Sequence, residues 1–193
     1  SFAAEFSKFQ RKLVDEYLAW QASIVREYKR PEQFVTHNLD YDFSMGYSSG
    51  VQPDVDHAEV AKCLDVAGCD IYHPTQDHLT GREIAMCGDL AYLVLETEAQ
   101  GFAHWTPYPG QLSLQAVSHL SSGAETVEYW HWHSIHNSME TYWKGLLSHD
   151  FKPSAMYQEA KTIGAAFKAL APNLLGLHKE NKAAVLISNT ALT

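Results

Sequence analysis

The chain has 193 residues, 46% of them hydrophobic and 19% charged, which is typical of a folded domain and argues against a disordered protein. Its 23 acidic and 14 basic residues give a formal net charge of −9. The basic residues form no cluster, and no apolar stretch approaches the ~18 residues of a membrane span, so neither nucleic acid nor a membrane is expected as a partner.

Apolar residues recur every three or four positions from Phe2 to Tyr28, which predicts one long amphipathic helix that ends before Pro31. A short strand over 34–36 follows, then a loop over 40–54. The remaining pattern predicts helices over 57–64, 82–87, 111–120, near Met139 and over 155–170. It predicts strands over 66–72, 91–96, 126–132 and 183–188.

This alternation gives four strand–helix units of roughly thirty residues, the unit size of a (β/α)8 barrel of ~250 residues. Four units make only half of such a barrel. The alternative is a small open, doubly wound α/β sheet, although neither GxGxxG nor GxxxxGK occurs to support nucleotide binding. The sequence therefore predicts an α/β fold, and a partial TIM barrel accounts for it as well as an open sheet does.

Glu96 is the strongest catalytic candidate, because it ends the apolar run of residues 91–95. A (β/α) barrel places catalytic groups at the carboxyl ends of its strands. The loop that follows contains Phe102, Trp105 and Tyr108, and such rings suit the C–H faces of a sugar. The combination indicates a glycosidase nucleophile. Glu98 is the nearest rival, expected on the same strand face but one step into the loop.

The other predicted strand ends carry Asn38, Asp70, Tyr72 and the segment 130–133, which together resemble the side chains of a carbohydrate subsite. Core closure and helix capping are the alternative explanations for these residues. The residues His131, His133 and His136 could also suggest zinc, but no HExxH occurs, and packing or hydrogen-bonding histidines are favoured. Cys63, Cys69 and Cys87 lack CxxC spacing and predict reduced thiols in a cytoplasmic protein.

Several motifs resemble glycoside hydrolase family 42 β-galactosidases. They are Leu93-Val94-Leu95-Glu96-Thr97-Glu98, Trp105-Thr106-Pro107-Tyr108, Val127-Glu128-Tyr129-Trp130-His131-Trp132, Ser138-Met139-Glu140, Val35-Thr36-His37-Asn38 and Cys69-Asp70-Ile71-Tyr72. The resemblance covers nearly the whole chain. It implies that residues 1–171 are the C-terminal half of the catalytic barrel, strands five to eight. Residues 172–193 would then be a linker and the first strand of a second, trimer-forming α/β domain.

The resemblance further implies a retaining hydrolase of terminal β-galactosides, with Glu96 as the nucleophile. Tyr72, Trp105 and Glu140 would bind substrate or orient the nucleophile, together with Trp143, which stands where family members commonly carry His. The family's acid/base Glu would precede residue 1, as would any zinc site, so the chain is expected to need no cofactor, to bind no metal and to be inactive alone. The intact parent would be a homotrimer that acts on a galactoside or oligosaccharide.

Two alternative functions remain open. Trp143 in place of His motivates a retaining glycosidase of another specificity, such as an arabinosidase or a fucosidase, because altered hydroxyl contacts change which epimer binds. The incomplete barrel without its acid/base motivates a non-catalytic carbohydrate-binding module that retains the aromatic rim.

Overall fold

The computed structural model describes residues 1–40, 55–72, 92–100, 106–177, 180, 182 and 183. Its centre is a sheet with the strand order β1-β2-β3-β4, formed by Asn38–Asp40, Ala67–Asp70, Tyr92–Glu98 and Ala124–Trp130. All three pairings are parallel. The carboxyl ends of the four strands therefore lie along one edge of the sheet.

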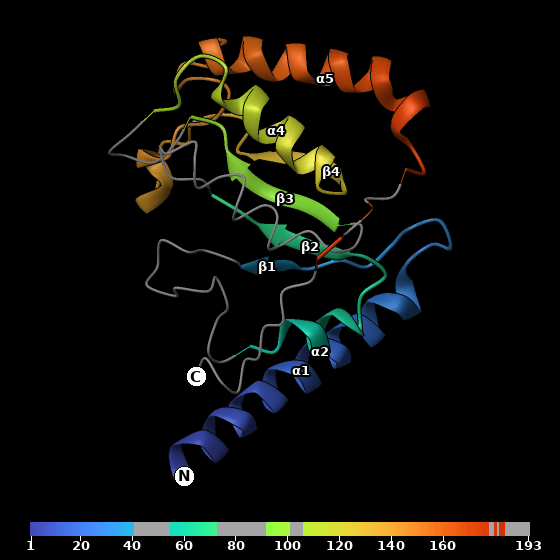
Figure 1. Cartoon of the computed structure of the whole chain (residues 1–193). Helices are drawn as coiled ribbons and strands as arrows, with labels where there is room; N and C mark the ends of the chain where they lie inside the picture. The colour runs from blue at the N-terminus through green and yellow to red at the C-terminus, as the bar shows by residue number, and fades with distance from the viewer. Residues whose placement is uncertain (41–54, 73–91, 101–105, 178–179, 181, 184–193) are drawn as a thin grey trace.

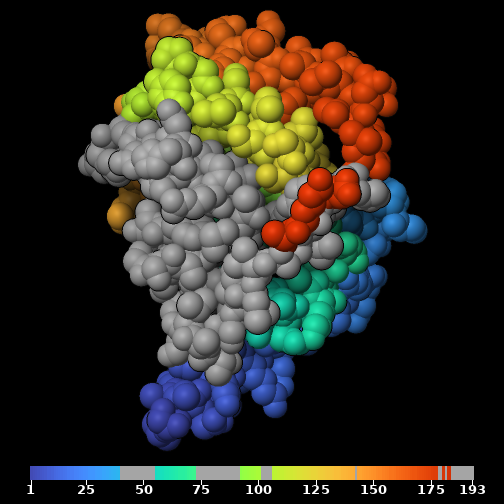
Figure 2. Space-filling view, viewed as in Figure 1, coloured from blue at the N-terminus to red at the C-terminus, as the bar shows by residue number. Residues whose placement is uncertain are grey.

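The helices are α1 (Phe2–Tyr28), α2 (His57–Ala61), α4 (Gln111–Ser121) and α5 (Ala155–Leu174), with a short 3-10 helix, η2 (Met139–Tyr142). Helices α1 and α2 lie beside the β1 side of the sheet, and α4 and α5 lie beside the β4 side (Figure 1). The space-filling view shows these two helical groups at opposite ends of the molecule (Figure 2). Within the described residues, no helix is long and apolar enough to cross a bilayer.

The predicted α/β fold and the long first helix are confirmed, whereas several predicted boundaries are wrong. The first strand is 38–40 and not 34–36. Val35 N–H donates to a side-chain oxygen, Asp65 Oδ2, at 2.8 Å instead of to a strand partner, although the Val35 carbonyl accepts from Asp65 N–H at 2.8 Å. The second strand ends two residues earlier than predicted, the third runs to Glu98, and the fourth begins and ends two residues earlier.

Some predicted helices also differ from those observed. The helix over 57–64 closes after Ala61, and the one near Met139 is a single 3-10 turn. Helix α5 continues to Leu174, where Gly176, with φ of 81°, allows the chain to turn away. The predicted helix over 82–87 and, apart from Ala183, the predicted strand over 183–188 lie outside the described residues.

Helix α1 leaves its apolar stripe in solvent. Phe2 is 85% exposed and Trp20 is 58% exposed. The other exposed large apolar side chains of the helix are Phe6, Phe9, Leu13, Tyr17, Ile24, Val25 and Tyr28. The 3.6-residue periodicity thus predicted the helix, but no described element covers its apolar face.

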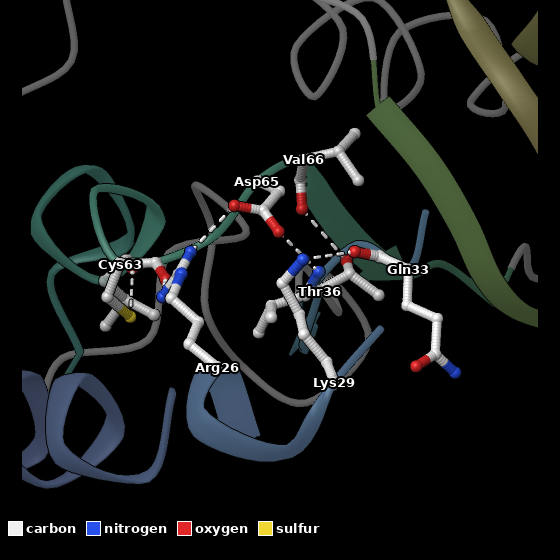
Figure 3. Close-up of polar contacts among 9 residues, drawn as sticks. Arg26, Lys29, Gln33, Thr36, Cys63, Asp65 and Val66 are labelled. Atoms are coloured by element: carbon white, nitrogen blue, oxygen red, sulfur yellow. Dashed lines mark hydrogen bonds and ion pairs between the residues drawn. The ribbon is translucent and has the colours of Figure 1, made fainter. Parts of the chain in front are cut away.

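The C-terminal end of α1 is held by polar contacts to the segment that leads into β2 (Figure 3). Arg26 donates from Nη1 to the Cys63 carbonyl at 2.7 Å and from Nη2 to Asp65 Oδ1 at 2.8 Å. Asp65 Oδ2 in turn accepts from Val35 N–H. One carboxylate therefore joins the helix to the backbone that precedes β1.

The core consists of two clusters. Cys69, Ile71, Tyr92, Val94 and Ala124 pack within the sheet, and the second cluster, of Leu112, Ala116, Met156 and Ile163, joins α4 to α5. Glu159 of α5 adds a polar link, because its carboxylate accepts from the backbone N–H groups of Gly110 and Ser113 at 3.0 and 2.8 Å. These N–H groups have no partner inside α4, so a helix from elsewhere in the chain caps it.

Candidate active site at the carboxyl edge of the sheet

The Glu96 carboxylate is held by two neutral donors, one from β1 and one from the segment that follows β2. Tyr72 Oη donates to Oε2 at 2.9 Å, and Asn38 Nδ2 donates to Oε1 at 3.0 Å. Within the described residues, no Lys or Arg side chain bonds to this carboxylate. The two hydrogen bonds therefore fix the orientation of the carboxylate.

A register shift in β3 sets the direction of Glu96. Cys69 pairs with Val94, yet the next residue of β2, Asp70, pairs with Glu96, so Leu95 is an extra residue. In strict alternation, Glu96 would point to the same side as Val94, whose side chain is fully buried in the sheet cluster. The shift turns Glu96 to the opposite side, as expected for a bulge near an active site.

Strands β3 and β4 show two such shifts. One lies between Tyr92 and Leu93, where β4 has the additional residue, and the other lies between Val94 and Thr97, where β3 has it. The pairs at the two ends remain Tyr92 with Ala124 and Glu98 with Trp130. The carboxyl ends of the two strands are therefore level at the edge that carries the site.

Tyr72 lies two residues after the end of β2 and is half-buried. Burial, and then the nearby negative charge of Glu96 and the hydrogen bond to it, raise the pKa of the Tyr72 phenol above its ordinary value of 10.0. Tyr72 is therefore a neutral donor throughout the physiological pH range. Tyr72 therefore lies beside Glu96, and its role toward substrate stays a prediction.

Asn38 and Asp70 extend this arrangement. Besides its bond to Glu96, Asn38 Nδ2 donates to Asp70 Oδ1 and Oδ2 at 3.0 and 3.1 Å. The sequence predicted both as polar groups of a possible carbohydrate subsite but gave neither a role. Asn38 opens β1, so its contact with Asp70 depends on the observed pairing of β1 with β2.

Glu98 does not lie where it was expected. It is the last residue of β3 and not a loop residue, and only 1% of it is exposed. Its carboxylate accepts from Gln115 Nε2 of α4 at 2.6 Å and from Thr97 Oγ1 at 2.9 Å. A buried carboxylate directed at a helix cannot meet a substrate at the open edge, so the geometry favours Glu96 over Glu98.

The other predicted substrate-binding residues are only partly described. Trp105 and Phe102 lie outside the described residues, and Tyr108 is 41% exposed. Glu140 lies in η2 and Trp143 follows it, with a backbone bond from Trp143 N–H to the Glu140 carbonyl at 3.0 Å. In the described structure, neither residue bonds to the Glu96 carboxylate, and their roles toward substrate stay predictions.

The histidines near the end of β4 contact backbone carbonyls. Ring nitrogens of His131, His133 and His136 lie 3.3, 3.0 and 2.7 Å from the carbonyls of Trp143, Ser134 and His149. In the part of the chain that the structure describes, no group of three or more His, Cys, Asp or Glu side chains is placed to hold a metal ion. These contacts fit the hydrogen-bonding role favoured for the histidines.

The parallel sheet and its strand-end carboxylate are the arrangement of a (β/α) barrel enzyme. A catalytic mutant of Gan42B, a GH42 β-galactosidase from G. stearothermophilus, superimposes with a TM-score of 0.84 at 18% identity, over 97% of this chain and 29% of that one. The β-galactosidase from Halorubrum lacusprofundi gives 0.70 at 23% identity, over 86% and 27%. These likenesses identify the fold.

Sequence comparison identifies the family. The model of the glycoside hydrolase family 42 β-galactosidases matches residues 1–170, so the chain belongs to this family. A β-galactosidase from an Arthrobacter species is 24% identical over 97% of this chain, and BgaH from Haloferax lucentense is 28% identical over 81%. The chain spans 27% and 26% of the lengths of these two relatives.

Proposed function

We propose that this chain forms strands five to eight of the catalytic barrel of a retaining β-galactosidase, with Glu96 as the nucleophile. The observation that carries the proposal is the Glu96 carboxylate at the carboxyl edge of a parallel sheet, held by Tyr72 and Asn38. The names of the family and of the relatives support a terminal β-galactoside as the substrate.

In the first step, one Glu96 oxygen attacks the anomeric carbon and the bond to the leaving-group oxygen breaks. That oxygen takes a proton from an acid/base carboxyl group on the other barrel half. The product is a galactosyl ester of Glu96. In the second step, the same acid/base group takes a proton from water, whose oxygen attacks the anomeric carbon and releases Glu96 and galactose.

The remaining parts of the proposal concern the intact protein. Residues 172–193 would begin a second α/β domain, the parent would be a cytoplasmic homotrimer, and this chain would need no cofactor. Trp105, Glu140 and Trp143 would contact the sugar beside Glu96. The chain alone would be inactive because it supplies only one of the two carboxyl groups that the mechanism needs.

The test is covalent trapping in a full-length protein that carries this chain together with an N-terminal barrel half. A 2-deoxy-2-fluoro-β-galactosyl compound with dinitrophenolate as leaving group accumulates as the glycosyl-enzyme. Its leaving group needs little protonation, so labelling depends on the nucleophile rather than on the acid/base residue. Intact-mass measurement followed by peptide mapping should find the label on Glu96.

The matched variants are Glu96→Gln and Glu98→Gln. The first should abolish labelling. The second should leave it measurable, because the Glu98 carboxylate is buried against α4. A label on Glu98, or a folded protein that takes no label at all, would overturn the assignment. Faster labelling of Glu96 by a fucosyl or arabinosyl analogue than by the galactosyl compound would support the retaining mechanism but contradict a β-galactoside as the substrate.

A further inference from the structure

The amide nitrogen of Asn38 is shared between two carboxylates. Its distances to Asp70 Oδ1, Asp70 Oδ2 and Glu96 Oε1 are 3.0, 3.1 and 3.0 Å. A primary amide has two N–H donors, so one serves Asp70 and the other serves Glu96. Asn38 is the first residue of β1, Asp70 is the last residue of β2, and Glu96 is the fifth of the seven residues of β3.

Strand pairing fixes this geometry. Asn38 opens β1 and pairs with Gly68, while Asp70 ends β2 and pairs with Glu96 across the register shift at Leu95. The backbone holds the last pair, since Ile71 N–H donates to the Glu96 carbonyl at 3.0 Å. Asp70 and Glu96 therefore lie side by side, with the Asn38 amide bonded to both.

An amide side chain has a donor end and an acceptor end, and it can rotate to exchange them. If Asn38 were turned, its carbonyl oxygen would face two carboxylates, which no hydrogen bond could offset. With Asp70 in place, only the donor end can face the Glu96 side. Without Asp70, Glu96 alone orients the amide, and the donor to Glu96 Oε1 is held less firmly.

We propose that Asp70 is a positioning residue that acts through Asn38: it fixes the donor end of the Asn38 amide on Glu96 and so sets the orientation of the nucleophilic carboxylate. Tyr72 holds Oε2 and Asn38 holds Oε1, so the carboxylate cannot turn about its own axis. Asp70 itself bonds to neither oxygen of Glu96 and to no reacting atom. This inference rests on the proposed function of Glu96.

The test is a double-mutant cycle in the same full-length protein, read as the rate of labelling by the fluorogalactosyl compound at saturation. Asn38→Ala should lower that rate about 10- to 100-fold, the effect of one lost hydrogen bond to a charged group. Asp70→Ala should lower it by a similar factor. The double variant should be no slower than Asn38→Ala alone, because the proposed effect of Asp70 on Glu96 passes through that amide.

Three controls separate the possible causes. Asp70→Asn should recover part of the rate, because its amide oxygen still accepts from Asn38, which a general packing role would not predict. Asp150→Asn changes an exposed carboxylate paired with Lys152 and should leave the rate unchanged. Thermal unfolding of every variant shows whether a slow protein is also a poorly folded one.

The outcomes distinguish the two proposals. Labelling that persists in Glu96→Gln removes the proposed function. Labelling that requires Glu96 but falls additively in the double variant, or does not fall in Asp70→Ala, overturns the positioning role alone. If Asp70→Ala does not fold, Asp70→Asn completes the cycle with Asn38→Ala, and additive losses there contradict the inference equally.

Discussion

Tyr72 donates a hydrogen bond from its phenol to Glu96 Oε2 at 2.9 Å, across the register shift that separates the ends of β2 and β3. The contact has consequences for both partners. It fixes one oxygen of the carboxylate, and the negative charge of Glu96 makes ionisation of the half-buried phenol more costly. The same hydrogen bond therefore orients the Glu96 carboxylate and helps to raise the pKa of the Tyr72 phenol.

Tyr72 should resist ionisation in the folded chain. Its pKa is raised above 10.0 by burial and by Glu96, so the neutral phenol stabilises the fold fully below pH 10.0, and this contribution is lost as pH rises above that value. Tyrosinate absorbance measures the titration. Because the Tyr72 phenol stays protonated at about pH 10, Tyr72→Phe should leave the tyrosinate absorbance step at that pH unchanged. A smaller step in this variant would contradict the prediction.

Gly68→Ala should destabilise the sheet. A Cβ at this position would meet the Leu95 side chain and lie 2.7 Å from the His37 carbonyl oxygen. The backbone oxygen cannot move aside cheaply, so the free energy of unfolding should fall by about 1–3 kcal/mol in chemical denaturation. Gly164→Ala is the control, because its Cβ meets nothing within 4 Å in α5 and should stabilise the helix by about 0.5–1 kcal/mol. Equal effects would refute the steric explanation.

Glu159→Ala should weaken the contact between α4 and α5. The substitution removes the acceptor for Gly110 N–H, Ser113 N–H and Ser113 Oγ, and should lower the free energy of unfolding by about 1–2 kcal/mol. Glu159→Gln keeps an acceptor without the charge and should lie between wild type and Ala. Glu27→Ala, on the exposed surface of α1, should change stability little. No loss in Glu159→Ala would show that water replaces the cap.

Asp65 should make the fold sensitive to acid. The hydrogen bonds from Arg26 and from Val35 N–H lower the pKa of this carboxyl below its ordinary value of 3.8. Its contribution is therefore complete above that value and is lost as pH falls through the lowered pKa. Thermal unfolding at about pH 7 and about pH 3 should show a smaller difference for Asp65→Asn than for wild type. Glu27→Gln, which lacks these partners, should retain the wild-type difference.

The sequence predicted the elements that depend on local pattern. The repeat of apolar residues located α1 at its observed ends, and the apolar run before Glu96 located the third strand. It could not predict that the stripe on α1 would be exposed, because burial depends on which other element packs against a helix. The first strand was predicted too early because Val35 is apolar. In the structure, the Val35 N–H donates to the Asp65 side chain and not to a neighbouring strand.

The candidate site was predictable in its main residue and only partly in its partners. Glu96 follows from its place after an apolar run that predicts a strand. Asn38 and Asp70 were expected at the same rim, but their contact depends on the register of β1 with β2, which a local pattern does not provide. The burial of Glu98 could not be foreseen, because Glu96 and Glu98 are two residues apart and regular alternation assigns them one face. Their separate environments depend on the register shifts in β3 and on Gln115 of α4.

The two shifts between β3 and β4 also affect how distant relatives should be aligned. The extra residue of β4 lies near the start of that strand, and the extra residue of β3 lies near its end. The two shifts cancel, so both strands have seven residues and their ends stay paired. A homologue that lacks one residue in each strand would form a regular ladder and still place the equivalent of Glu98 opposite that of Trp130. Paired single-residue gaps at these two places are therefore compatible with level strand ends in such a relative.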